Sequence, residues 1–331
     1  MENFLNQCQI VKKKNWIIID PPLFTPRASL FSFSDYAQTF LPKKENFVIV
    51  NESCDCSVEQ IIQLIEYAKK NKSKLILSGE NPPNKDKIKS LVNEFVWAVE
   101  MGVGLIDNPN EVFVPQPWYR MQTGWLKYKK KMGWQLSNKK FISTMRCKNN
   151  YHPKMLLYKE LEELNILEKF MWSCTFHESI LKTKTPRYFD SEINFEGVDA
   201  ELPSVEQTQS YTHTVIETGF DWIVSEKIWQ GFAFSQPIYW WTINNHFKIV
   251  EQYGFVTDFQ GIDNDYLETT DHNKRAKNLA LELKKLADNP DLAYEIYIKN
   301  KDIVLHNHSL FFDINSCREA GFKALQSKLD I

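Results

Sequence analysis

The chain has 331 residues, a formal net charge of −2, 25% charged residues and 43% hydrophobic residues. This balance is typical of a soluble globular protein, and the length suggests two domains of ordinary size. The near-neutral charge argues against general nucleic-acid binding, and no apolar run approaches the ~18 residues that a membrane span needs. The six cysteines lack the usual zinc spacing, so we expect free thiols and a cytoplasmic location.

The first half of the chain alternates between short apolar runs and helical patterns. A helix is expected over residues 57–68, where Ser57 can cap the first turn and Gln60 follows three positions later. Short strands that are apolar throughout and separated by helices predict a parallel sheet. The expected strands are residues 16–19, 47–50, 74–77, 96–99 and 112–114.

The second half repeats this alternation after a polar, basic and aromatic stretch. Residues 118–140 are expected to form a linker with a loop, and residues 183–209 an irregular excursion. The expected strands are 141–144, 214–217 and 237–240, and the expected helices are 153–170, 225–234, 273–286 and 291–303.

Two α/β halves predict two Rossmann-type domains that face an interdomain cleft. The expected limits are 1–125 for the first domain, 126–140 for a linker, and 141–308 for the second domain. A C-terminal helix over 309–331 can pack back on the first domain. Ligands of such sheets bind at the carboxyl ends of strands. The residues that follow strands are therefore candidates: Asp20, Glu52, Glu80, Arg146, Glu217 and the pair Glu226–Lys227.

The sequence Ser225-Glu226-Lys227 opens an expected helix. A helix N-terminus offers free backbone N–H groups and the positive end of the helix dipole, and Lys227 adds a point charge suited to a diphosphate. Glu226 could accept hydrogen bonds from a ribose diol. The alternative is that Ser225 is an ordinary N-cap and the other two are ordinary first-turn residues.

The context of this segment resembles a known family. Residues 218–228 (TGFDWIVSEKI), followed by Pro237-Ile238-Tyr239-Trp240, resemble the donor-binding motif of the family 10 α-1,3/1,4-fucosyltransferases. Ser78-Gly79-Glu80-Asn81 resembles the Gly-Glu-Asn element of that family's acceptor domain, and residues 255–259 resemble its following apolar-acidic strand. The chain departs from the pattern at Ile223 and Trp241 and lacks an Asn after Glu217, so the sugar is left open.

The resemblance implies a GT-B fold and an inverting glycosyltransferase that moves fucose from GDP-fucose to a hydroxyl of a glycan acceptor. Glu80 would be the general base. Lys227, with Lys154 or Arg146, would neutralise the diphosphate, and Glu226 would hold the ribose. No metal ion and no cofactor is implied. The remaining donor-binding candidates are Ser225, Glu217, Trp222 and Tyr239.

Other interpretations stay open. Residues 258–266 and 306–308 also resemble parts of virus- and phage-encoded proteins. The acceptor could be a polysaccharide, a protein or a modified base in viral DNA. The net charge argues against DNA, and the lysine-rich stretch 127–140, expected to be a solvated surface, is the one feature that could reverse this. A non-catalytic binding or virion protein could keep the same fold. The sequence Asp263-Asn264-Asp265 is expected to be a turn, and His213, His306 and His308 are expected to be structural.

Overall fold

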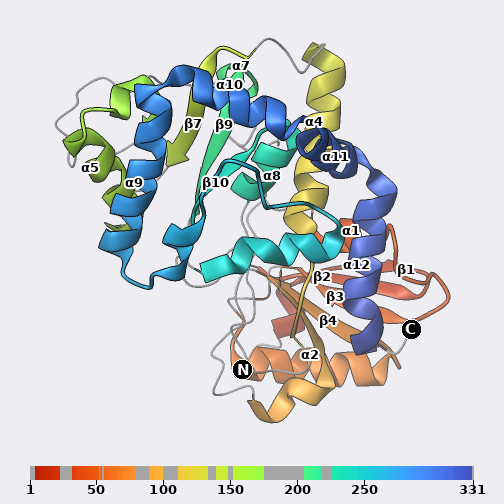
Figure 1. Cartoon of the computed structure of the whole chain (residues 1–331). Helices are drawn as coiled ribbons and strands as arrows, with labels where there is room; N and C mark the ends of the chain where they lie inside the picture. The colour runs from red at the N-terminus through yellow and green to blue at the C-terminus, as the bar shows by residue number, and fades with distance from the viewer. Residues whose placement is uncertain are drawn as a thin grey trace. The chain divides into compact units, whose positions relative to one another are not determined.

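The computed structural model describes residues 4–22, 32–51, 53, 56–79, 89–99, 111–132, 139–147, 152–174, 205–217, 226–242 and 244–329. The chain divides into two compact units. Unit 1 comprises residues 1–120 and 314–331, and unit 2 comprises residues 121–313. Each unit is built on its own sheet (Figure 1). The expected arrangement of two domains around a cleft stays a prediction.

The described part of unit 1 contains a six-stranded sheet with the order β1-β2-β3-β4-β5-β6. Strands β2 to β6 are parallel, which confirms the prediction for the first half of the chain. An additional strand, β1, pairs antiparallel with β2 at the edge. The strands are β1 (Gln9–Lys13), β2 (Trp16–Asp20), β3 (Phe47–Val50), β4 (Lys74–Gly79), β5 (Val96–Val99) and β6 (Glu111–Phe113).

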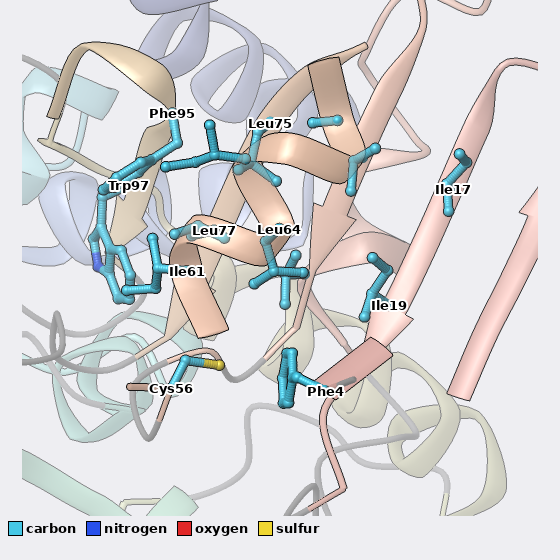
Figure 2. Close-up of a cluster of buried hydrophobic side chains, with 14 residues drawn as sticks. Phe4, Ile17, Ile19, Cys56, Ile61, Leu64, Leu75, Leu77, Phe95 and Trp97 are labelled. Carbon is cyan, nitrogen blue, oxygen red and sulfur yellow. The ribbon is translucent and has the colours of Figure 1, made fainter. Parts of the chain in front are cut away.

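One face of this sheet is covered by helix α2 (Val58–Lys70). The helix begins with the expected capping box, in which Ser57 accepts from the backbone N–H of Gln60 and the Gln60 side chain accepts from the Ser57 N–H. Its buried stripe includes Ile61 and Leu64, which pack on alternate residues of four strands. Figure 2 shows this apolar cluster, whose strand residues are Ile17, Ile19, Val48, Val50, Leu75, Leu77 and Trp97.

Two further helices of unit 1 pack against each other. The Tyr36 hydroxyl of α1 (Phe33–Ala37) donates to the carbonyl of Cys317 in α12 (Ile314–Leu329) at 2.5 Å. Gly321 of α12 allows this approach, since a Cβ atom there would lie 2.6 Å from the ring of Phe40. Helix α12 also contacts β5 and β6. The C-terminal residues therefore belong to the core of unit 1. The 3-10 helices of this unit are η1 (Phe4–Asn6) and η4 (Lys89–Glu94).

The sheet described in unit 2 has four parallel strands in the order β10-β9-β7-β8. They are β7 (Phe141–Cys147), β8 (Met171–Cys174), β9 (Ser210–Ile216) and β10 (Ile238–Trp241). The central pair is unusually polar. Ser143 of β7 shares a hydrogen bond of 3.1 Å with Thr214 of β9, and Thr144 shares one of 3.0 Å with His213. The α/β prediction is confirmed for both halves of the chain.

The two crossover helices of unit 2 lie on opposite faces of its sheet. Tyr158 of α5 (His152–Glu163) contacts Trp172 of β8. Trp172 is in register with Met145, and Met145 with Thr214, so these side chains share the α5 face. His213, the preceding residue, faces a glycine of α8 (Glu226–Ala233) on the other side. Figure 1 shows α5 and α8 on the two sides of the strands.

Three long helices complete unit 2: α9 (His272–Asp288), α10 (Pro290–Lys299) and α11 (Lys301–Phe312). Helix α9 packs against α5, and α11 packs against α8. The remaining elements among the described residues of this unit are α7 (Val205–Thr208), η5 (Leu167–Lys169), η6 (Asn244–Tyr253) and η7 (Asp265–Glu268). No helix in the described ranges is both long enough and apolar enough to cross a membrane.

Several expectations about elements were wrong. The expected linker over 126–140 is helical as far as Met132, because α4 (Gln116–Met132) buries Trp118, Met121 and Trp125 at helical spacing. The helix expected over 153–170 ends at Glu163, where Asn165 takes a positive φ of 56°. The helix expected over 291–303 is interrupted at Asn300.

The apolar-acidic segment 255–259 is not a strand, although it was expected to be one. Two buried asparagines bind the backbone of this segment and of the residue after it, in place of a neighbouring strand. Asn307 accepts from the N–H of Val256 at 2.9 Å and donates to its carbonyl at 2.8 Å. Asn300 makes the same pair of bonds with Gln260, at 2.8 and 2.9 Å.

Candidate functional site

The strand order of unit 2 reverses between its two central strands. Strand β7 continues through α5 to β8 on one side, whereas β9 continues through α8 to β10 on the other side. The two crossover helices therefore leave this point in opposite directions and on opposite faces. In open α/β sheets a ligand binds outside the carboxyl ends of the strands at such a topological switch point. Cys147 ends β7 and Ile216 ends β9, so the candidate site lies next to them.

A buried lysine occupies the first turn of each crossover helix. Lys154 is the third residue of α5 and is 1% exposed, and Lys227 is the second residue of α8 and is 8% exposed. Lysine is rarely buried to this extent without partners, and both residues interact with other groups of the protein. Both helices begin at the carboxyl edge of the sheet. Two helix N-termini, each with a lysine in its first turn, therefore lie at the switch point.

A buried carboxylate lies at the same edge. Glu217 follows the last residue of β9 and is 1% exposed. Its backbone N–H donates to the carbonyl of Trp241 at 3.2 Å, which extends the ladder between β9 and β10 by one bond. The register then places Glu217 next to Thr242, the first residue after β10. Of the nine predicted site residues, the structure thus brings Lys154, Lys227 and Glu217 to one edge.

Arg275 is a charged residue near this edge that the sequence interpretation missed. It lies in α9, is fully buried, and donates to the Thr242 carbonyl at 2.5 Å. Further hydrogen bonds run from its guanidinium to the carbonyls of Leu267 and Thr269. Burial lowers the pKa of Arg275, and the hydroxyl of Tyr266 acts in the opposite sense. The helical period could have revealed it, since position 275 falls on the buried stripe that continues at 279 and 283.

Three other predicted residues are placed in unit 2 without being tested as ligands. The backbone of Glu226 starts α8, and the backbone of Arg146 lies in β7, one residue before its end. Tyr239 is buried in β10 in register with Thr214, so its side chain is on the α5 face. Burial, followed by the charge of Glu282, raises the pKa of Tyr239. Its role in donor binding stays a prediction.

The remaining predicted residues lie outside the described residues. Glu80 directly follows Gly79, the last residue of β4, as the strand prediction required, but its own position is not described. The same holds for Trp222 and Ser225, which precede α8. The proposed general base and part of the donor motif therefore stay predictions.

A different charged cluster lies at the amino end of the same sheet. Lys139 precedes β7 and donates to the carbonyls of Thr208 and Phe234 at 2.9 and 3.0 Å. Burial lowers the pKa of Lys139 to about 7. Burial, and then the charge of Lys139, lowers the pKa of His213 to about 3. Lys139 is at the edge opposite to the switch point and His213 is in the middle of β9, so we regard both as structural.

The motifs that were discounted as metal sites have structural contacts. His306 shares a hydrogen bond of 2.9 Å with the carbonyl of Gly254, and His308 shares one of 2.8 Å with that of Ala233. The side chain of Asp263 accepts from the Asp265 N–H at 2.9 Å, as in a turn. Within the described ranges no group of three histidines, cysteines or acidic residues could hold a metal ion.

The switch-point edge can therefore bind an anion. Two lysines and two helix N-termini supply positive charge and N–H donors, which together suit a phosphate or diphosphate. Glu217 can accept hydrogen bonds from hydroxyl groups of the same ligand.

Comparisons with known proteins add little to this geometry. No family profile and no curated protein matches the chain. Among solved structures, one described as a crystal structure of an α1,3-fucosyltransferase is similar, with 11% sequence identity and a TM-score of 0.46. The similarity covers 95% of this chain and 96% of that one.

Proposed function

We propose that the chain is a glycosyltransferase whose unit 2 binds the nucleoside diphosphate of a sugar donor. The observation that carries the proposal is the pair Lys154 and Lys227. Each starts a crossover helix on one side of the topological switch point, and each is almost completely buried. A diphosphate at this point would meet both ammonium groups and both helix N-termini.

The chemistry of glycosyl transfer accounts for this arrangement. The transition state resembles an oxocarbenium ion, and negative charge develops on the leaving diphosphate. Positive groups that are already fixed at the diphosphate stabilise that charge without reorganising. Lys154 and Lys227 would therefore act most strongly in the transition state. With this charge supplied by side chains and helix N-termini, the proposed reaction uses no metal ion.

The finer assignments come from the sequence resemblance. Glu80 would take the proton of the acceptor hydroxyl in an inverting reaction, and Glu226 would bind the ribose. Glu217, buried at the end of β9, would accept hydrogen bonds from donor hydroxyls. The donor would be GDP-fucose, and the acceptor a glycan.

A panel of nucleotide sugars tests the proposal. The unfolding temperature of the full chain would be measured with GDP-, UDP-, dTDP- and CMP-sugars, each compared with its free nucleoside. A donor at 100 times its Kd should add about 2.7 kcal/mol to the free energy of unfolding. The largest shift should occur with GDP-fucose. If no nucleotide sugar raises the unfolding temperature, the proposed function is wrong.

A further inference from the structure

Arg275 is a buried charge whose described hydrogen-bond partners are all neutral. Its four hydrogen bonds all go to backbone carbonyls, those of Thr242, Leu267 and Thr269. In the part of the chain that the structure describes, no carboxylate forms an ion pair with it. Buried charges are normally paired with an opposite charge, because moving an isolated ion out of water is costly. The hydrogen bonds engage four of the five guanidinium N–H groups and bring no negative charge to it.

The position of this charge is fixed by the β10 ladder. Arg275 binds the carbonyl of Thr242, which directly follows the last residue of β10. Neighbouring strands are roughly 5 Å apart, and Glu217 lies opposite Thr242 on β9. The guanidinium therefore lies near the carboxyl ends of β9 and β10, and it extends from α9, which packs against α5.

We propose that Arg275 is a positioning residue for the diphosphate of the donor. It fixes the chain that leaves β10, and its buried charge favours an anion at the adjacent edge. This inference rests on the proposed function, since it assumes that a diphosphate binds at the switch point. Arg275 itself does not contact the ligand. It acts through Thr242 and through the electrostatic potential of a water-poor interior, where charges interact over longer distances than in solvent.

The charge and the hydrogen bonds can be separated by two substitutions. Arg275→Gln keeps an amide donor and removes the charge, whereas Arg275→Lys keeps the charge and loses the planar fork. Tyr266→Phe is a neutral control in the same region, because the Tyr266 hydroxyl accepts from the N–H of Trp240 at 3.0 Å. A purely structural defect should lower the affinity for every ligand of the site by a similar factor.

The measurement is the ratio of diphosphate affinity to nucleoside affinity. GDP and UDP, with guanosine and uridine, would be titrated into the full chain by calorimetry. Arg275→Gln should lower the affinity for the diphosphate about tenfold and leave the affinity for the corresponding nucleoside within twofold of wild type. Arg275→Lys should stay within threefold of the wild-type ratio, and Tyr266→Phe should not change it.

Each outcome bears on the inference. If wild type binds neither diphosphate, the proposed function fails and the inference falls with it. If wild type binds and Arg275→Gln keeps the wild-type ratio, only the inference is overturned. Where Arg275→Gln does not fold, Arg275→Lys decides. A tenfold loss of its ratio would show that the hydrogen bonds of the fork matter rather than the charge, and would overturn the electrostatic role of Arg275.

Discussion

Lys227 gives the sharpest test of the proposed site. Replacing it with methionine keeps the length and apolar character of the side chain and removes one positive charge from a position that is 8% exposed. A unit charge about 4 Å from a phosphate oxygen gains about 4 kcal/mol at an effective dielectric constant near 20. Part of this gain offsets the desolvation of the two ions. We expect a loss of about 2 to 3 kcal/mol in binding, or roughly 30- to 150-fold in Kd.

Calorimetric titration of the full chain with GDP measures this loss. Lys274→Met is the matched control, because Lys274 is also in the first turn of a helix of unit 2 but is exposed. Its GDP affinity should stay within twofold of wild type. Guanosine affinity should be almost unchanged in both variants, since guanosine carries no phosphate. If Lys227→Met binds GDP as tightly as the control, the lysine is structural and the argument from the switch point is wrong.

Three further changes test other parts of the structure. Glu80→Gln should abolish sugar transfer and leave donor affinity within threefold, because the carboxylate is proposed to act only as a base; unchanged turnover would refute that role. Burial lowers the pKa of Lys139 to about 7 from 10.5, so between these values the unfolded chain binds more protons than the native state. The free energy of unfolding should therefore rise from pH 7 towards pH 10, and Lys139→Met should remove this rise. If the free energy of unfolding, measured with urea, rises equally with pH in both proteins, the expectation is contradicted. Gly231→Ala would place a Cβ atom 2.6 Å from Cγ1 of Ile238 and should cost about 1 to 3 kcal/mol, seen as a lower urea midpoint. Ile238→Val in that background should recover part of the loss, and an unchanged midpoint in Gly231→Ala alone would show that α8 moves freely.

The central strands of unit 1 could be predicted because their signal is local. Each of β2, β3 and β4 is an apolar run buried on both faces. The capping box of α2 can be recognised from the four consecutive residues 57–60. Strand β1 (Gln9–Lys13) was missed because it is polar and exposed at the sheet edge. Its pairing with β2 depends on a neighbour rather than on its own composition.

Errors in unit 2 arose where tertiary contacts decide the structure. Helix α4 was mistaken for a loop because its lysines obscured the buried positions Trp118, Met121 and Trp125. The segment 255–259 has the composition of a strand, but Asn307 binds the backbone of Val256 within it, and Asn300 binds that of Gln260 directly after it. Neither asparagine can be connected with this segment from sequence spacing, because the contacts span 40 and 51 positions.

The candidate site was only partly predictable for the same reason. Lys154, Lys227 and Glu217 follow strands in the sequence, so each could be placed at a carboxyl edge. The strand order that makes the edge between β7 and β9 a switch point depends on long-range pairing. Arg275 follows no strand and reaches the edge only through the packing of α9.

Burial alone does not mark a lysine as functional, and unit 2 contains the comparison that shows why. Lys139 is also a lysine with a largely buried amine, but it lies at the amino edge, where the carbonyls of Thr208 and Phe234 accept its hydrogen bonds. Its low pKa follows from burial and requires no ligand. Lys154 and Lys227 differ because they start helices at the opposite edge, where the helix dipoles add to their charge. Substitution of Lys139 should therefore change the pH dependence of stability without changing diphosphate affinity, whereas substitution of Lys227 should lower diphosphate affinity.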